Sequence, residues 1–538
     1  MIDSHAVSGK SKFEMTELNL KSGKYYTFKN IPKNLYNTLK LSSEVFPDKT
    51  AFIENGRKLT YEQLKNEADR LSESLISSYG VNKGDRVALL MVNSIDFCTA
   101  FYSLSRIGAV VLPISTKSKQ IEIERLLIDS EAKILILDAK WWDNVKNILS
   151  NTKIEKCILS GSGTIPEIGE TIESLVKRSK GFIKLEVPGL DDPAVLIYTS
   201  GTTGAPKGAL LSNFNLLHGI MCYQKILGLT SDDSTVISVP IFHITGLAAL
   251  MALFVHIGGT IVFEPYFNAG STLKIINEHK ITFFHASPTV FILLLEESDS
   301  LKTVPSLRKA ACGSANMPPA VLDKLKSWIP GMDFHTVYGL TETSSPATIM
   351  PDDVYKTGKI GSSGKPIPGF DIKIIDEEGM ELASNEVGEL LVKGSNVLCS
   401  YWNKQQNRDA FIDGWFRTGD YARIDEDGFL YIVDRKKDMI NRGGEKIYSI
   451  EVENVIYNHP AVNEVALIGV PDPVYGEVAK AIISLKQGCS ASEEEIKKWV
   501  SERLAKFKVP QYIQFTEEMP HTNNGKISKT MLRDMYLN

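Results

Sequence analysis

The stretch YTSGTTGAPKG, residues 198–208, gathers hydroxyl side chains, glycines and a lysine in one short run. Glycines let a backbone approach a ligand closely. Hydroxyl groups donate hydrogen bonds and the lysine adds positive charge, which together suit the oxygens of a phosphate chain. The candidate phosphate contacts are Thr199, Ser200, Gly201, Thr202, Thr203, Gly204 and Lys207.

Two common phosphate loops do not fit this stretch. A Walker A loop needs glycine before its lysine and Ser or Thr after it, whereas Pro206 precedes Lys207 and Gly208 follows it. The dinucleotide fingerprint G-x-G-x-x-G is also missing from this stretch. The remaining readings are another kind of phosphate loop or a glycine–threonine turn that binds nothing.

The segments around this loop predict an α/β fold. Between about residues 50 and 300, strand-like apolar runs such as residues 86–94 alternate with helical stretches. This rhythm predicts a large N-terminal domain of parallel sheets covered by helices. The loop itself is expected to be a strand-to-helix turn, between a strand that begins near residue 191 and a helix over residues 211–227, where the helix dipole favours anions.

The pattern changes after about residue 365, where short strands with Gly and Asp turns predict a small β-rich unit. A charged, glycine-containing linker follows at residues 434–447, and the rest alternates as a compact α+β domain. The expected division is a loosely held arm at 1–30, a large domain at 31–435 and a mobile domain at 436–538. The most apolar window, residues 246–259, predicts a buried core helix, because it is too short to span a bilayer; weak peripheral membrane contact stays open.

Composition narrows the function classes. The chain has 538 residues, enough for two or more domains, with 43% hydrophobic and 23% charged residues. A formal net charge of −5 gives no sign of a nucleic-acid surface. The six cysteines form no C-x-x-C pair and the first thirty residues lack the apolar core of a signal peptide, so we expect a reduced, cytoplasmic protein.

The phosphate-loop string resembles the signature of the adenylate-forming (ANL) superfamily, in its acyl-CoA synthetase and 4-coumarate–CoA ligase-like branch. Further similar stretches follow in the family's order at residues 338–343 (YGLTET), 414–420 (GWFRTGD), 434–451 and 524–529 (NGKISK). The resemblance spans roughly residues 30–538. It implies an enzyme that joins a fatty or aryl carboxylic acid to AMP from ATP with Mg²⁺, releases pyrophosphate, and passes the acyl group to coenzyme A.

The resemblance also implies roles for single residues. Lys526 is the implied catalytic lysine, Thr341 contacts the α-phosphate and Glu342 holds Mg²⁺. The implied adenine and ribose contacts are Gly313, Ala315, Tyr338, Gly339, Asp420 and Arg435. Without the resemblance, Asp420 reads as a turn residue, Glu342 as a carboxylate at a helix N-terminus, and Lys526 as a solvated lysine.

The mobile domain and the acid pocket are assigned in the same way. Lys437 is the implied hinge, and Gly443 and Gly444 are implied to line the coenzyme A tunnel after rotation. The implied acyl pocket includes His243, Thr245 and Gly246. Amino-acid-activating relatives carry an Asp at the position of His243, and an ammonium group buried without a counter-ion is costly, so an amino acid substrate is disfavoured.

Coenzyme A is the simplest expected acceptor of the acyl group. Two alternatives stay open: an acyl-AMP ligase that loads a free-standing carrier protein, and a binding protein that kept the fold without the activity. The expected partners are the carboxylic acid, ATP and coenzyme A, with no nucleic acid and no transmembrane segment. Oligomeric state and chain length of the acid are not readable from the sequence.

Overall fold

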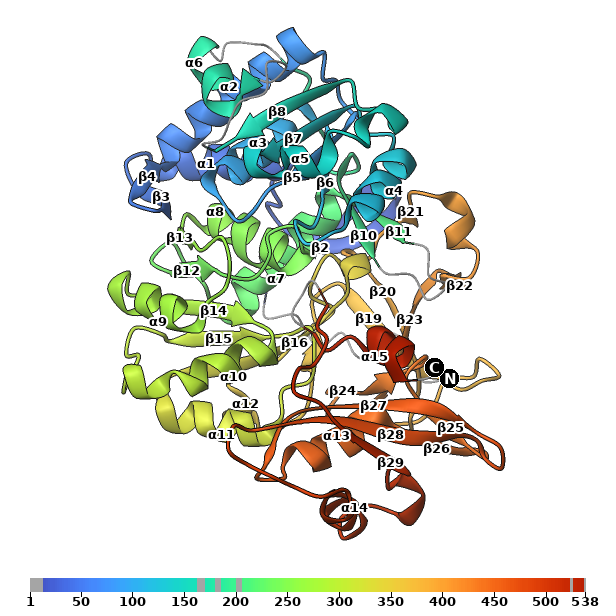
Figure 1. Ribbon diagram of the computed structural model, residues 1–538. Helices are drawn as coiled ribbons and strands as arrows, with labels where there is room; N and C mark the ends of the chain where they lie inside the picture. Colours follow the sequence, from blue (N-terminus) through green and yellow to red (C-terminus); the bar gives the residue numbers. More distant parts are fainter. Residues whose placement is uncertain (1–12, 162–169, 180–184, 200–205, 523–525, 537–538) are drawn as a thin grey trace.

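A computed structural model describes residues 13–161, 170–179, 185–199, 206–522 and 526–536 (Figure 1). Two large sheets with helices between and around them form the body of the molecule, and a smaller α+β domain packs below them. The predicted α/β class is confirmed, with antiparallel strands added at the sheet edges.

The first sheet has eight strands in the order β21-β11-β10-β6-β5-β7-β8-β9. Its strands β10 to β9 run parallel, whereas β11 and β21 are antiparallel to their neighbours. The strands are β5 (Arg86–Leu90), β6 (Val110–Pro113), β7 (Ile134–Asp138), β8 (Lys156–Ser160), β9 (Glu170–Thr171), β10 (Pro193–Thr199), β11 (Lys207–Ser212) and β21 (Ser400–Tyr401). The helices of this part are α2 (Tyr61–Tyr79), α3 (Ile95–Ile107), α4 (Gln120–Ser130), α5 (Trp142–Val145) and α6 (Ile172–Arg178).

The second sheet has nine strands in the order β18-β17-β16-β15-β14-β12-β13-β3-β4. Its strands are β3 (Thr50–Glu54), β4 (Arg57–Thr60), β12 (Ser234–Ile237), β13 (Thr260–Phe263), β14 (Phe283–Ala286), β15 (Lys309–Cys312), β16 (Asp333–Tyr338), β17 (Thr348–Ile349) and β18 (Lys365–Pro366). Its helices are α1 (Leu35–Val45), α7 (Asn213–Leu227), η3 (Thr245–Ala252), α8 (Leu253–Ile257), α9 (Ala269–Glu278), α10 (Pro288–Glu296), α11 (Pro319–Trp328), η5 (Thr341–Thr343) and α12 (Val354–Thr357).

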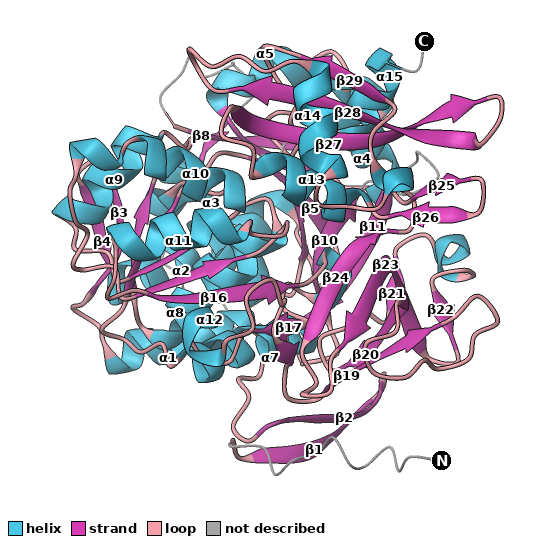
Figure 2. Cartoon of the chain, turned by 90° about the horizontal axis from the view of Figure 1, so that it is seen from below, coloured by secondary structure: helices cyan, strands magenta, loops and turns pink. Residues whose placement is uncertain are grey.

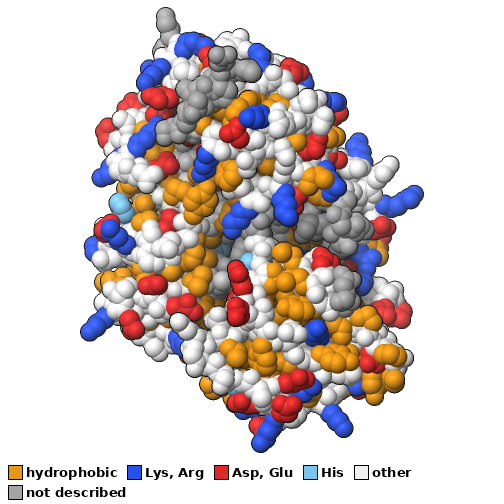
Figure 3. All heavy atoms as spheres, viewed as in Figure 1, with side chains coloured by type: hydrophobic (Ala, Val, Ile, Leu, Met, Phe, Trp, Pro, Cys, Tyr) orange, Lys and Arg blue, Asp and Glu red, His pale blue; other side chains and the backbone are white. Residues whose placement is uncertain are grey.

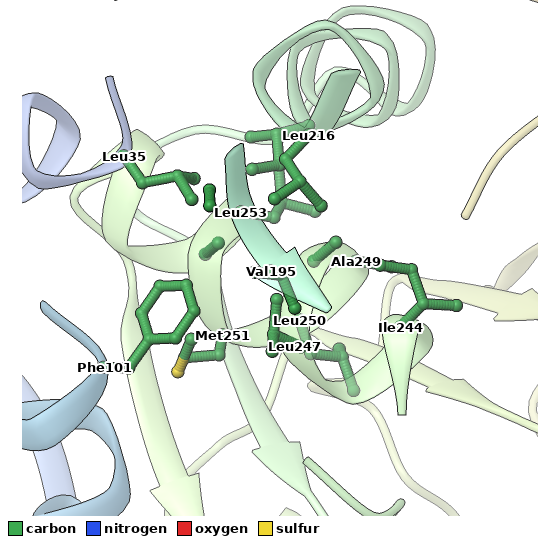
Figure 4. Close-up of a cluster of buried hydrophobic side chains, with 14 of the residues drawn as sticks. Leu35, Phe101, Val195, Leu216, Ile244, Leu247, Ala249, Leu250, Met251 and Leu253 are labelled. Carbon is green, nitrogen blue, oxygen red and sulfur yellow. The ribbon is translucent and has the colours of Figure 1, made fainter. Parts of the chain in front are cut away.

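One apolar core joins the two sheets. The apolar window predicted as a core helix forms η3, a π-helical segment, and α8, and its side chains from Leu247 to Met251 are at most 1% exposed. Figure 4 shows these residues meeting Leu35 of α1, Phe101 of α3 and Val195 of β10. Among the described residues, no helix is long and apolar enough to cross a membrane.

The predicted β-rich unit and C-terminal domain are both present. The first contains β19 (Phe370–Ile375), β20 (Gly388–Gly394), β22 (Phe411–Ile412), β23 (Trp415–Ile424) and β24 (Leu430–Arg435). The second contains β25 (Ile440–Arg442), β26 (Glu445–Ile447), α13 (Ser449–Tyr457), β27 (Val462–Asp472), β28 (Gly476–Leu485), α14 (Glu493–Ser501), β29 (Tyr512–Phe515) and α15 (Lys529–Tyr536). Much of the predicted linker is therefore regular structure, because β25 and β26 pair as a hairpin.

The N-terminal region differs from the expected loose arm. Strands β1 (Met15–Leu20) and β2 (Gly23–Phe28) form a hairpin that lies against β19 and β20 (Figure 2). Phe28 is 2% exposed, Thr27 shares a 2.8 Å hydrogen bond with Nδ1 of His218, and Ser395 donates to the Tyr26 carbonyl at 2.9 Å. These tertiary contacts hold residues 13–28 against the rest of the molecule.

The expected strand-to-helix turn at the phosphate loop is also wrong. The loop joins β10 to β11, two antiparallel strands, and the helix α7 starts only at Asn213. Ser212 sets this start, because its hydroxyl accepts a hydrogen bond from the Asn215 N–H and caps the helix. A helix dipole therefore does not act on the loop directly.

Candidate functional site

A buried glutamate joins the two sheets at the end of the phosphate loop. Glu342 is 9% exposed, and its Oε1 accepts hydrogen bonds from Thr199 Oγ1 at 3.2 Å and from the Tyr401 hydroxyl at 2.8 Å. Thr199 ends β10, and Lys207 begins β11 with its Nζ 5.5 Å from the centre of the Tyr401 ring. The candidate contacts at 200–204 lie outside the described residues.

The turn before Glu342 explains why a glycine stands at 339. A Cβ on Gly339 would lie 1.4 Å from the Ser345 carbonyl oxygen, so no larger residue fits. The short helix η5 then places Thr341 and Glu342 at the end of β16. Although Glu342 stands in the first turn of η5, its carboxylate accepts hydrogen bonds from Thr199 and Tyr401 of the neighbouring sheet.

A second cluster lies at the end of the β-rich unit. Asp420 is 2% exposed; its Oδ2 accepts from the Tyr338 hydroxyl at 2.6 Å, and its Oδ1 lies 3.3 Å from Nε of Arg435. The pairing of β23 with β24 places Asp420 opposite Arg435. Burial raises the pKa of Asp420, while the Arg435 charge acts in the opposite direction. Three side chains from different parts of the sequence thus form one polar cluster.

The C-terminal domain brings Lys526 to this second cluster. Burial and the positive charge of Arg435 lower the pKa of Lys526 to about 8, and the Asp420 carboxylate partly offsets them. The Lys526 N–H donates a 3.2 Å hydrogen bond to Thr522 Oγ1. Lys529, three residues on, instead pairs with Glu453 at 2.7 Å inside the small domain. Lys526 is therefore the one of these two lysines that faces the site.

The adenine-flanking candidates lie at the ends of β15 and β16. A Cβ on Gly313 would lie 2.9 Å from the Val337 carbonyl oxygen, so this glycine permits close strand packing. Ala315 is exposed in the loop that follows. Cys312 is buried and burial raises its thiol pKa, which makes it an unreactive packing residue.

The acyl-pocket candidates stand at the start of η3. His243 and Thr245 are half-buried, and a Cβ on Gly246 would lie 2.4 Å from the Pro240 carbonyl oxygen. Gly246 thus lets η3 pack against the chain before it. These residues are set in the apolar core that Figure 4 shows around Ile244 and Leu247.

The hinge candidate lies where the two domains meet, whereas the tunnel candidates lie in an exposed turn of the C-terminal domain. Lys437 is exposed between β24 and β25, and its carbonyl accepts a hydrogen bond from Arg533 at 3.5 Å. Gly443 and Gly444 form the turn of the β25–β26 hairpin with φ of +58° and +96°, a backbone that suits glycine. They are exposed, and the Gly443 N–H donates to the Tyr475 carbonyl at 2.8 Å, so they are not part of the two clusters in this arrangement.

The residues present fit one magnesium ion carried by a nucleotide. No group of three or more His, Cys, Asp or Glu able to hold a metal occurs in the described part of the chain. Within that same part, no hydrogen bond is made to Oε2 of Glu342, because both hydroxyl donors take Oε1. Magnesium is often bound by one or two carboxylates together with substrate phosphates, and Glu342 supplies one such carboxylate.

Tyr401 is a site residue that the sequence alone does not reveal. It lies 59 positions from Glu342 and in no glycine-rich or charged motif. Its place depends on the pairing of β21 with β11, which is a long-range contact. The nearest sequence signal is the aromatic pair YW before the 3₁₀ turn at 404–407, a pattern too common to assign.

The comparisons with known proteins cover nearly the whole chain. The model of the AMP-binding enzyme family matches residues 39–402, and that of the AMP-binding enzyme C-terminal domain matches residues 451–526. A long-chain-fatty-acid–CoA ligase of Bacillus subtilis is 35% identical over 530 residues, covering 93% of this chain and 94% of the relative.

Two solved structures extend these similarities to the fold. An anthranilate CoA ligase in complex with anthranoyl-AMP has a TM-score of 0.87 at 29% identity, covering 94% of this chain and 97% of the other. The o-succinylbenzoate coenzyme A synthetase of Bacillus subtilis, in complex with ATP and a magnesium ion, has a TM-score of 0.81 at 31% identity, covering 92% and 99%.

Proposed function

This chain belongs to the AMP-binding enzyme family and is an acyl-CoA synthetase, and on that premise we propose which residues carry the two half-reactions. The enzyme uses ATP with magnesium and coenzyme A as co-substrates. The carboxylic acid attacks the α-phosphorus of ATP, pyrophosphate leaves, and the thiol of coenzyme A then displaces AMP from the acyl-adenylate. The observation that carries the proposal is that Lys526 of the C-terminal domain is close enough to Asp420 and Arg435 of the large domain for their charges to shift its pKa.

The proposed roles follow from the two clusters. Asp420 and Arg435 hold the ribose hydroxyls, and the Tyr338 ring, fixed through its hydroxyl to Asp420, flanks the adenine. The phosphate chain lies toward Thr199, Lys207 and Thr341, within reach of the Glu342 carboxylate. When bound there, magnesium offsets the negative charge of the phosphates.

Lys526 has the proposed catalytic role in the first half-reaction. Two anions, the carboxylate and the α-phosphate, must approach each other, and a fixed cation between them stabilises the charge of the transition state. With a pKa of about 8, the ammonium form predominates at neutral pH. The other proposed contacts of the nucleotide are Gly313, Ala315, Gly339 and the loop residues 200–204.

For the second half-reaction, we propose that the C-terminal domain, 436–538, turns about Lys437. The turn would bring the exposed Gly443–Gly444 hairpin to the site in place of Lys526. Glycines suit a tunnel wall because they leave room for the thiol arm of coenzyme A. The large domain would then comprise residues 31–435 together with the β1–β2 hairpin.

The proposed acid has an uncharged acyl or aryl tail. His243 and Thr245 lie beside an apolar helix, and none of the described pocket candidates is a carboxylate that could pair with a substrate ammonium.

The proposed location is cytoplasmic, supported by six cysteines that are all unpaired, two of them exposed.

A pyrophosphate-release assay over a panel of fatty, aryl and amino acids, with and without coenzyme A, tests these proposals. We expect release with at least one apolar acid, and a thioester product only when coenzyme A is added. Release without a thioester would point to a carrier protein as acceptor. No release with any acid would overturn the proposed chemistry.

A further inference from the structure

Tyr401 reaches the site from a strand that belongs to a distant part of the chain. It is 4% exposed and lies in β21, where it pairs with Ala209 of β11. The next residue, Trp402, donates its N–H to the Gly208 carbonyl at 2.8 Å. The ring is therefore fixed against the strand that leaves the phosphate loop.

The hydroxyl of Tyr401 acts on one oxygen of Glu342. Burial and the nearby Glu342 charge raise the pKa of Tyr401, so the phenol keeps its proton and donates it to Oε1 at 2.8 Å. The Thr199 hydroxyl lies 3.2 Å from the same oxygen, nearer than its 3.4 Å to the Lys207 carbonyl, and donates to the nearer acceptor. The terminal torsion of a glutamate side chain is soft, and two donors on one oxygen restrict it.

The ring of Tyr401 acts on a second group. The Lys207 ammonium lies 5.5 Å from the ring centre, a distance at which the ring face attracts a cation. One side chain thus contacts both the candidate magnesium carboxylate and the lysine of the phosphate loop.

We infer, on the basis of the proposed function, that Tyr401 is a positioning residue: it turns Glu342 so that Oε2 faces the magnesium–nucleotide complex, and it supports Lys207 beside the phosphates. It is not a catalytic residue, because its hydroxyl is committed to Glu342. Outer groups that orient a metal ligand commonly change metal affinity by about 10- to 100-fold when removed.

The test is calorimetric titration of the full-length protein with ATP, in the presence and absence of magnesium and without any acid. We expect Tyr401→Phe to bind ATP alone as the wild type does, because the ring remains under Lys207. The gain in ATP affinity on adding magnesium should shrink by about tenfold. In assays with an accepted acid, the magnesium concentration for half-maximal rate should rise while KM for the acid stays constant.

A double substitution separates orientation from general packing. If Tyr401 acts through Glu342, adding Tyr401→Phe to Glu342→Gln should cause no further loss of the magnesium effect. Equal, additive effects in the two backgrounds would overturn the inference, as would an unchanged magnesium effect in Tyr401→Phe itself.

A matched control and a second variant complete the design. Tyr79→Phe removes another phenol–carboxylate hydrogen bond, 2.9 Å to Glu170, away from both clusters, and should leave the magnesium effect unchanged. If Tyr401→Phe unfolds at a much lower temperature than Tyr79→Phe, Thr199→Val removes the other donor to Oε1. Because Thr199 is also a proposed phosphate contact, this variant is compared in the wild-type and Glu342→Gln backgrounds, and it should weaken the magnesium effect only in the first. An unaltered magnesium effect in Thr199→Val would then refute the inference.

A wild type that binds magnesium–ATP but activates no acid would count against the proposed function instead.

Discussion

Lys526 carries the positive charge that the proposed first half-reaction needs. It is close enough to Asp420 and Arg435 for their charges to act on it, and these are the residues that we propose to hold the ribose. We predict that Lys526→Ala slows pyrophosphate release by roughly 100-fold, a loss of about 3 kcal/mol of transition-state stabilisation. Thioester formation from preformed acyl-adenylate should change little. Equal losses in both half-reactions would contradict a role confined to adenylation.

The pH dependence of the reaction follows from the same lysine. Because only the protonated form stabilises the developing negative charge, activity should fall as pH rises through the pKa of about 8. The fall should appear in kcat/KM, which reports the free enzyme, and at higher pH in kcat, because bound phosphates favour the ammonium form. Lys526→Arg should remove the fall between pH 7 and 10, since a guanidinium stays charged. A descending limb that persists in Lys526→Arg would assign it to another group.

At the level of single residues, local motifs predicted most members of the two clusters. Asp420, Arg435, Glu342 and Lys526 each stand in a short stretch with a family likeness, and the structure brings Lys526 to Asp420 although 106 positions separate them. Tyr401 could not be predicted in this way. Its contacts depend on an edge strand two residues long, whose pairing no local pattern encodes.

Among the elements, the turn from β16 into η5 is the most restrictive. A Cβ on Gly339 would overlap the Ser345 carbonyl oxygen, so Gly339→Ala must displace the turn that carries Thr341 and Glu342. We expect a loss of at least about 3 kcal/mol of stability, or failure to fold, measured as a lower Tm. The control Gly331→Ala has no atom within 4 Å of its new Cβ and should leave Tm almost unchanged. A Gly339→Ala protein as stable as this control would contradict the turn geometry.

The elements also show where sequence patterns fail. The buried run at residues 86–94, which contains β5, is predicted correctly, because parallel strands covered on both faces are continuously apolar. The short apolar run that forms β11 could equally be a strand or the first turn of the helix that follows it. Periodicity cannot distinguish the two structures over so few residues. Only the pairing of this run with β10 and β21 decides for a strand. The β1–β2 hairpin was misread for the same reason, since its stability comes from contacts with His218 and Ser395.

On the scale of the whole molecule, the face shown in Figure 3 carries charged side chains of both signs. Acidic and basic side chains are interspersed over the face seen in Figure 3, which agrees with the modest net charge. At this scale, the position of the C-terminal domain decides which half-reaction the proposed site can carry out. Two contacts between residues on either side of Lys437 hold this domain against the large domain. They are the 2.9 Å hydrogen bond from Ser449 Oγ to Asp434 and the 2.8 Å ion pair of Lys446 with Glu377.

A cross-link that keeps the C-terminal domain in this position should permit adenylate formation but block thioester formation. Lys446 and Glu377 are exposed, on opposite sides of the hinge, so Glu377→Cys with Lys446→Cys can be joined by a short reversible bis-thiosulfonate linker. The exposed native thiols Cys399 and Cys489 are first replaced by serine. Because Lys526 already faces Asp420, the linked protein should still form one equivalent of acyl-adenylate, while thioester formation falls by more than about tenfold.

The linked and reduced states of the same protein form the comparison. Reduction of the linker should restore thioester formation, and each single-cysteine variant treated with the reagent should keep it. The assay follows pyrophosphate and thioester in one turnover. If the linked protein makes thioester at the wild-type rate, the domain does not need to turn about Lys437, and the glycine hairpin at 443–444 has no place in the second half-reaction. If adenylate formation is lost as well, the present position of Lys526 is not the one from which it acts.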